Sequence, residues 1–514
     1  MRAVSVMTPL IAAMLGLTCT TDSLARDRVL QVVGPWEITG IDPIRAGYVF
    51  GRMGVAETLV TVDGDGNPIP ALAESWSVSD DRLVWRFALR PAARFHDGTP
   101  VTAEAAVAAL EKARSGAGVL SRTPIAEITA EGSDVVIRTA TPFAPLPAFL
   151  ANYTSIVLAP ASWNGEGKFA GIVGSGPYRV SGLTPPLRLD VERFDGWWGG
   201  SPKVGQARYL SVPRGETRAL MAESGEADLA FALLPAHMDR LRRNPRVDVR
   251  VVPIPRTRML KVNAGSVFFD QVEERRALSL TLDRAGMATA ILRNPANAAG
   301  QLLPPSMAEW HVHDLPPLRR DTAEAKRLLA AAGWKAGQDG ILVSPDGERF
   351  SVQLRTFTNW PELPLMATAM QAQLREVGIE LDVAVGNSSE IPAGHRDGSL
   401  QMGLASRNFS LVPDPLGTLL EDYGPDGGEW GAMNWSDPAL TKTLEALKTT
   451  FDPAERAPLR ARVSEIIQTE LPVIPIAWFE LGVAVNKRLG SVTIDPFEIS
   501  YHLADLTWAD AEAP

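Results

Sequence analysis

Cysteine is almost absent from this chain of 514 residues, because the single one, Cys19, lies close to the amino terminus. Residues 20–514 therefore offer no thiol nucleophile, no disulfide and no cysteine-based metal site. The chain also lacks any run of about eighteen apolar residues that would span a bilayer. It has no Lys/Arg tract, and its formal net charge is −10. These absences argue against cysteine catalysis, a membrane-embedded protein and nucleic-acid binding.

Sequence motifs of common catalytic sites are also missing. There is no Gly-x-Ser-x-Gly elbow, no His-Glu-x-x-His helix and no Walker glycine loop. We therefore expect a protein that is not an enzyme and has no cofactor. The alternative of another class is a secreted peptide hydrolase, which would need a titrating histidine such as His96. Its neighbours Asp97 and Gly98 form a turn dipeptide, and Thr102 stands at a helix N-cap position, which favours an architectural role.

The first twenty-five residues have the three-part layout of a secretory signal. Arg2 is followed by the apolar stretch "VMTPLIAAMLGLTCT" and by a small-residue exit that ends at Ala25. We expect residues 1–25 to be a signal peptide and the mature protein to be periplasmic. Lipid anchoring at Cys19 is the less favoured alternative, because the preceding "GLT" lacks the usual leucine and small-residue placement.

The rest of the chain has the composition of a globular α/β protein. It is 45% hydrophobic and 21% charged, and its length suffices for two or three packed domains. The alternation in "LVWRFALR" predicts a half-buried strand over residues 83–90. Helical patterns end at Gly225 and Gly333, where a left-handed residue is expected. We find no internal repeat.

A series of motifs carries a resemblance over essentially the whole chain after residue 25. The block "ALAESWSVSDDRLVWRFALRPAARFHDGTPVTAEA" is followed in order by "VGSGPYRV", "RFDGWWGGSPKV", "RALMAESGEADLA", "DTAEAKRLLAAAGW" and "LPVIPIAW". Together they resemble the landmarks of the periplasmic solute-binding proteins of ABC importers for oligopeptides, dipeptides and nickel. The resemblance implies an α/β, two-lobed periplasmic binding protein fold with an extra structural subdomain in the first lobe.

The resemblance also implies a domain division and partners. Lobe I is expected to contain residues 26–66, 183–255 and 478–514, with a structural subdomain, residues 67–182, inserted in it. Lobe II is expected to contain residues 256–477, with the crossover near Pro253. Such a protein closes about a hinge on its ligand and delivers it to an ABC permease with its ATPase subunits at the inner membrane. We expect a monomer that binds no nucleic acid.

The ligand is less well defined by the motifs. The segment "TAEAAVAAL" and the carboxy-terminal region look more like the nickel-binding branch, so nickel or a metal chelate is the expected cargo. The alternative is a dipeptide or oligopeptide, and a third reading is haem, opines or sugars. Phe409 and Pro413 replace a tryptophan and a tyrosine of the nickel binders, and Leu411 stands where dipeptide binders place an aspartate.

The resemblance places the segment "RNFSLVPDP" at the cleft. Arg407 there offers a planar fork of five donors and Phe409 a stacking face, whereas Asp414 is expected to cap the next element. On this basis Arg407→Ala should weaken ligand binding much more than it lowers the melting temperature. The other ligand-binding candidates are Tyr48, Arg52, Tyr153, Trp360 and, as a lid, Trp430. His311 and His313 are spaced as a metal-ligating pair would be, although a solvated loop is favoured.

Overall fold

The computed structural model describes residues 28–42, 47–116, 118–425 and 427–509. The predicted signal peptide and Cys19 lie outside these residues. Within them, no helix combines the length and apolar character that crossing a membrane requires.

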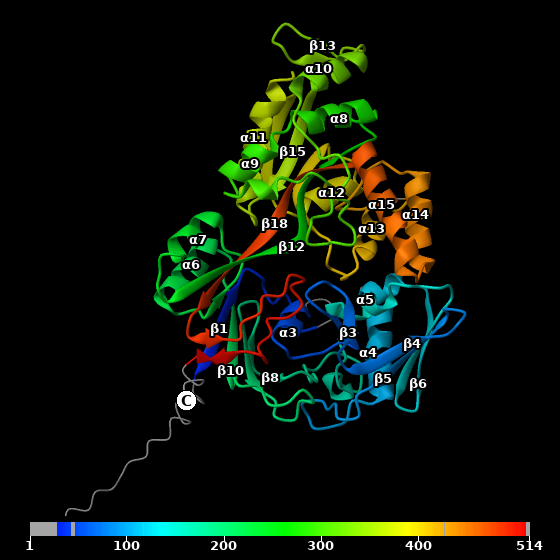
Figure 1. The fold of residues 1–514 in the computed structure, drawn as a ribbon, viewed down its shortest axis with the longest axis vertical. Coiled ribbons are helices and arrows are strands. Elements are labelled where there is room, and N and C mark those ends of the chain that lie inside the picture. Colours follow the sequence, from blue (N-terminus) through cyan, green and yellow to red (C-terminus); the bar gives the residue numbers. More distant parts are fainter. Residues whose placement is uncertain (1–27, 43–46, 117, 426, 510–514) are drawn as a thin grey trace, which may run out of the picture.

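One ten-stranded sheet runs through both lobes (Figure 1). Its strands in spatial order are β16 (Glu380–Gly386), β15 (Ser351–Phe357), β17 (Met402–Asn408), β12 (Val247–Val262), β18 (Val473–Asn486), β11 (Leu229–Ala230), β1 (Val29–Gly34), β10 (Gln206–Ser211), β9 (Arg188–Arg193) and β8 (Tyr178–Thr184). The first lobe contains β1 and β8–β11, and the second contains β15–β17. The long antiparallel pair β12 and β18 joins them, which confirms the two-lobed α/β fold.

The pairing of β12 with β18 is interrupted where the two lobes meet. Val247 to Ile254 pair regularly with Asn486 to Phe479, and the register then shifts between Ile254 and Thr257. Pro255 and Arg256 fall inside this irregularity, so Arg256 is carried by a bulge in the connecting strand. The predicted lobe boundaries remain a prediction, and the bulge lies beside one of them.

A smaller four-stranded sheet extends the first lobe. Its order is β4 (Ala73–Val78), β5 (Val84–Leu89), β7 (Asp134–Thr139) and β6 (Ile125–Glu131), and it packs against α4 (Ala103–Ser115) and α5 (Leu146–Leu150). The predicted strand over residues 83–90 is confirmed as β5, with Trp85, Phe87 and Leu89 buried. Thr102 caps α4 by accepting a hydrogen bond from Ala105 N at 3.2 Å, as predicted.

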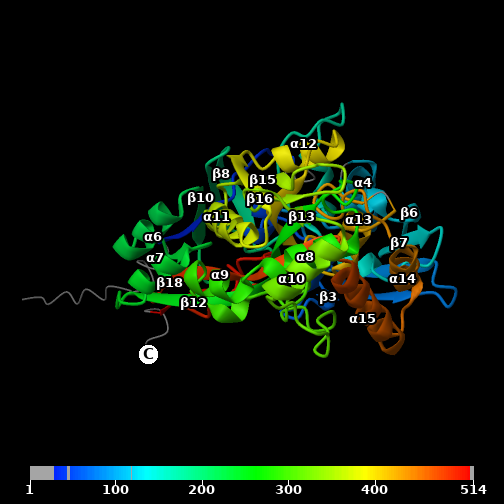
Figure 2. The same ribbon diagram turned by 90° about the horizontal axis from the view of Figure 1, so that it is seen from above.

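The remaining elements cover the sheets. In the first lobe they are α3 (Tyr48–Arg52), α6 (Gly215–Ser224), α7 (Pro235–Leu241) and the hairpin of β2 (Val60–Val62) and β3 (Pro68–Pro70). In the second they are α8 (Val272–Thr281), α9 (Arg284–Ala290), α10 (Thr322–Ala331), α11 (Glu362–Arg375), α12 (Glu390–Arg396), α13 (Leu416–Asp422), α14 (Pro438–Thr449) and α15 (Pro453–Glu470). Helices α8 and α10 lie side by side there (Figures 1 and 2). Gly225 and Gly333, just after α6 and α10, both have positive φ as predicted.

The two lobes contact each other away from the connecting strands. Phe451, between α14 and α15, stacks on Trp85 of the small sheet with ring centroids 5.9 Å apart. Arg122 pairs with Glu421 at 2.7 Å, and Ala144 N donates to Lys448 O at 2.7 Å. We call these three contacts the clasp. Because the clasp and the connecting strands join the lobes at separate places, the space between them is enclosed from two sides.

Candidate functional site

A cavity of about 650 Å³ lies between the lobes. This volume is within the range of roughly 300 to 1,000 Å³ that small-molecule sites occupy. Its lining includes residues of the first lobe, the strand β12, the segment after β17 and the carboxy-terminal segment 497–505. A larger cleft of about 1,330 Å³ is bordered by α6 and α7 of the first lobe and by α9 and α11 of the second. The smaller cavity is the better candidate because its volume falls within this range, whereas that of the larger cleft exceeds it.

Aromatic side chains form one wall of the cavity. Tyr48 and Tyr153 meet edge to face with ring centroids 6.0 Å apart, and the Tyr48 hydroxyl donates to Glu37 O at 2.6 Å. Burial raises the pKa of Tyr48 and of Tyr153, so both hydroxyls stay protonated in the physiological range. Trp36 lies beside Arg52, whose guanidinium carbon is 4.2 Å from the centre of the Trp36 ring. The wall therefore offers apolar faces with hydroxyl groups at their edges.

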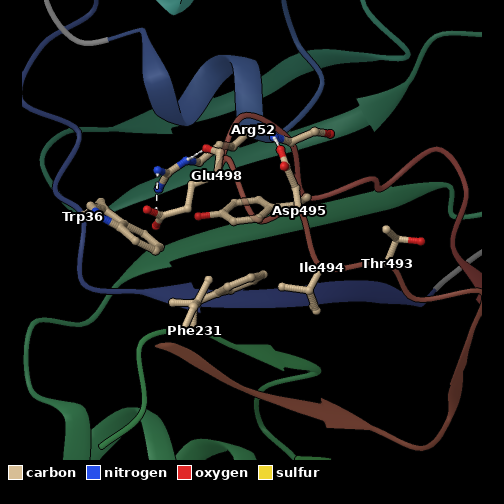
Figure 3. Close-up of a pocket in the computed structure, with 10 residues that line it drawn as sticks. Trp36, Arg52, Phe231, Thr493, Ile494, Asp495 and Glu498 are labelled. Carbon is tan, nitrogen blue, oxygen red and sulfur yellow. Dashed lines mark hydrogen bonds and ion pairs between the residues drawn. The ribbon is translucent and has the colours of Figure 1, made fainter. Parts of the chain in front are cut away.

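Two buried arginines and one glutamate form the charged part of the lining. Arg52 comes from α3, Arg256 from the bulge of β12, and Glu498 from the carboxy-terminal segment. Figure 3 shows Arg52 and Glu498 joined above Trp36 in the small hollow that adjoins the cavity. Arg256 Nη2 donates to Glu498 Oε2 at 2.7 Å.

Glu57 is a fourth buried ionisable group in the lining. Its Oε1 accepts hydrogen bonds from Trp197 Nε1 at 3.1 Å and Trp198 Nε1 at 3.0 Å, while Oε2 is buried without a hydrogen-bond partner. Burial raises the pKa of Glu57 to about 7, and the two indole donors offset only part of this effect. Glu57 thus exchanges a proton near neutral pH.

Three of the residues predicted from the sequence lie together in the cavity lining: Tyr48, Arg52 and Tyr153. Their contact with a ligand remains a prediction. Trp360 instead lines the larger cleft, where it meets Phe479 edge to face at 5.0 Å. Trp430 packs, partly buried, against the core of the second lobe and is not among the described residues that line either space.

Arg407 and Phe409 do not reach the cavity lining, contrary to the expectation from the sequence. Arg407 donates to both carboxylate oxygens of Asp422 at 2.6 and 2.8 Å, and Phe409 is fully buried in a core cluster. Their neighbours Asn408 and Ser410 line the cavity instead. The segment lies at the cavity, but successive side chains of an extended chain point to opposite sides, and the apolar Phe409 faces the core.

Asp414 and the histidine pair have local roles in this structure. Asp414 Oδ1 accepts a hydrogen bond from Leu416 N, the first residue of α13, at 3.0 Å, and Asp414 also pairs with Arg456 at 2.8 Å, but the N-cap position of α13 is Pro415. His311 Nδ1 contacts Leu303 O at 2.9 Å, and its ring meets that of His313 edge to face. Among the residues that the structure describes, no group of three or more His, Cys, Asp or Glu side chains is arranged to hold a metal ion.

The histidines give little support to a hydrolase. His96 lies outside the cavity lining, its Nε2 is 3.0 Å from Gly176 O, and burial lowers its pKa to about 4. His502 does line the cavity and its Nδ1 is 3.4 Å from Asp505. Within the described part of the chain, no hydroxyl is found in hydrogen-bond contact with the His502 ring, so this pair has no nucleophile to activate.

Trp36, Glu57, Arg256 and Glu498 are among the lining residues that were not predicted from the sequence. Arg256 and Glu498 are 242 positions apart in the chain, so no local pattern announces their pairing. Glu498 has a positive φ of 57°, a strained conformation for this residue type, but strain is not visible in a sequence. The "PIPRTR" run carried a weak signal, because its two prolines interrupt a strand pattern next to Arg256.

The fold and the enclosed interlobe cavity are those of a two-lobed protein that binds a solute between its lobes. Residues 67–430 match the family described as bacterial extracellular solute-binding proteins, family 5 Middle. The chain therefore belongs to this family, whose members are substrate-binding proteins that work with ABC permeases.

Individual relatives agree in length as well as in fold. The nickel-binding periplasmic protein of Escherichia coli K12 is 26% identical over 91% of this chain and 94% of its own length. The glutathione-binding protein GsiB of the same strain is 28% identical, covering 96% and 97%. The crystal structure of NikA from Brucella suis in complex with Fe(III)-EDTA has a TM-score of 0.82 at 23% identity, covering 94% of this chain and all of the other.

Proposed function

We propose that this protein is the periplasmic receptor of an ABC importer and that it captures a metal–chelate complex by hinge closure. The observation that carries the proposal is the composition of the cavity, in which two buried arginines and several aromatic rings converge and which Asn408, Ser410 and Leu411 line from the second lobe. Guanidinium groups and aromatic faces suit an anionic or planar organic solute. A bare Ni²⁺ ion would require several imidazoles or carboxylates around one point, and the described residues offer no such group.

Closure follows from the position of the cavity between the lobes. A ligand that contacts both lobes favours the closed form over the open form, and the permease then binds the closed protein. A full reversal of a 1:99 population to 99:1 requires a preference for the closed form of about 5.5 kcal/mol. The clasp contributes contacts that exist only while the lobes are together, so it sets the population of the closed form before the ligand binds, and the ligand must supply the whole of the shift from that population.

A peptide ligand is the alternative, and it is supported by the 28% identity to a glutathione-binding protein. The position at which dipeptide binders hold an amino terminus is occupied by Leu411, whose side chain lines the cavity and is 42% exposed. Of the two buried carboxylates in the lining, Glu498 pairs with two arginines, and burial raises the pKa of Glu57 to about 7, which weakens its negative charge at neutral pH. The cavity therefore favours an anionic group over an ammonium group.

A thermal-shift panel tests the proposal. The mature protein is heated with NiCl₂ alone, Ni²⁺ with L-histidine, Fe(III)-EDTA, glutathione and a dialanine peptide. We expect a metal chelate to raise the melting temperature. At a concentration a hundredfold above Kd, the chelate should stabilise the folded protein by about 2.7 kcal/mol. NiCl₂ alone should leave the melting temperature unchanged. Equal stabilisation by NiCl₂ alone, or stabilisation by the peptides only, would contradict a chelate receptor, and peptide cleavage would contradict a receptor altogether.

A further inference from the structure

Glu498 is the only carboxylate that serves both buried arginines of the cavity within the described structure. Arg52 Nε donates to Glu498 O at 2.5 Å and Arg52 Nη2 is 3.6 Å from Glu498 Oε1. Arg256 Nη2 donates to Glu498 Oε2 at 2.7 Å. The side chains are 9%, 9% and 5% exposed for Arg52, Arg256 and Glu498, so two positive charges and one negative charge are held away from solvent.

The other charged groups nearby do not neutralise the second arginine. Arg258 has its own partner, Glu362, at 2.6 Å. Asp505 pairs with His502 and its side chain is 65% exposed. Glu57 is bound by two indole donors and titrates near neutral pH. Asp495, in the small hollow beside Arg52, accepts hydrogen bonds from the backbone of Phe497, Ile499 and Ser500 instead. Arg52, Arg256 and Glu498 as a group therefore keep an excess of one positive charge, and an uncompensated buried charge costs several kcal/mol.

Each arginine also has an unused donor. Arg256 Nη1 and Arg52 Nη1 are buried and meet no acceptor in hydrogen-bond geometry among the described residues, and the Tyr501 hydroxyl is the group that lies near the Arg52 guanidinium. Aromatic rings lie near both guanidiniums: Trp36 is 4.2 Å from Arg52, and Phe479 and Trp360 are 5.1 and 5.3 Å from Arg256. With the faces of the groups occupied, an acceptor has to approach in the guanidinium plane, which is the geometry in which arginine binds carboxylates.

We infer that Arg52 and Arg256 form a clamp for a carboxylate group of the ligand, and that Glu498 is the positioning residue that holds both guanidiniums at the cavity wall. This inference rests on the proposed receptor function and narrows its ligand class to organic carboxylates. It also gives the ligand a means of closure, because one ligand group engages both α3 of the first lobe and the bulge that joins the lobes.

The test compares ligands that differ only in this group. Isothermal titration calorimetry measures the Kd for nickel complexed to L-histidine and for nickel complexed to L-histidinamide. In the second complex a neutral amide replaces each carboxylate. We expect the acid to bind more tightly than the amide by roughly 10- to 100-fold, the equivalent of a charge-assisted hydrogen bond. Arg256→Gln and Arg52→Gln should each remove most of this preference.

Arg250→Gln is the matched control, because Arg250 lies on the same strand β12, pairs with Asp248 at 3.0 Å and is absent from the cavity lining. It should keep the preference for the acid. Equal binding of the acid and the amide complex by the parent protein would overturn the clamp and leave the receptor function intact. Because this comparison uses the parent protein, it tests the clamp even if an arginine variant is too unstable to titrate. Stabilisation by inorganic phosphate but by no carboxylate would also overturn the clamp. Binding of neither complex, with no stabilisation in the thermal-shift panel, would overturn both proposals.

Discussion

Arg407→Ala is expected to lower the free energy of unfolding by about 3 to 5 kcal/mol, the usual cost of removing one partner from a buried ion pair. The side chains of Arg407 and Asp422 are 9% and 1% exposed, and their two hydrogen bonds fix a bidentate geometry. The substitution leaves the carboxylate of Asp422 buried without its main partner, and burial already raises the pKa of that group. Urea denaturation of the variant beside the parent protein measures the loss.

This result would be the reverse of what the sequence suggests for Arg407, because binding by the folded variant should be nearly unchanged. The double variant Arg407→Met with Asp422→Leu provides the control. It removes both charges together, and buried pairs replaced in this way often keep or regain stability. A single variant that keeps its melting temperature but loses the ligand would place Arg407 in the binding site after all.

Glu57→Gln is expected to change how stability depends on pH. The pKa of Glu57 is raised to about 7 by burial, so between about pH 4.5 and 7 the folded protein binds a proton that the unfolded chain has released. Glu57 therefore lowers the free energy of unfolding as pH rises through this window, by about 3 kcal/mol in total. Glutamine cannot ionise, so the variant should lack this loss.

Urea midpoints at pH 5 and pH 8 for the parent and the variant measure the difference. Burial lowers the pKa of His96 to about 4, so His96 has the opposite effect: the free energy of unfolding falls as pH drops below about 6.5. Because His96 is present in both proteins, its contribution cancels in the comparison. Glu74→Gln, at an exposed position on β4, is the control and should follow the parent. If Glu57→Gln follows the parent too, the carboxylate is not buried in the way described.

The sequence predicted the fold well because its signals are local or span long motifs. The alternation of β5, the Thr102 cap and the glycine after α6 each follow from a few neighbouring residues. The two-lobed architecture came from the resemblance, since nothing local requires that β12 and β18 connect two lobes. The membership of the family is now supported by the match over residues 67–430.

The site was predicted only in part, for physical reasons. Tyr48, Arg52 and Tyr153 line the cavity, and their contact with a ligand stays a prediction. The segment after β17 does lie at the cavity, but Asn408 and Ser410 line it and Arg407 and Phe409 do not. The alternation of an extended chain tells which residues share a face, and it does not tell which face meets the cavity. The clamp could not be predicted from the sequence, because Arg256 and Glu498 are distant in the chain and meet only in the folded structure.

The central claim is that the two lobes close on a ligand held between them, and a distance measurement between the lobes tests it most directly. Because Cys19 is the only cysteine and lies in the predicted signal peptide, Ala126→Cys and Ala439→Cys would give a mature protein with two unique labelling sites, both exposed and on opposite lobes. Double electron–electron resonance between spin labels at these sites should show a broad, long-distance population without ligand and a single shorter distance with the chelate that stabilises the protein. One unchanged distance in both states would contradict hinge closure.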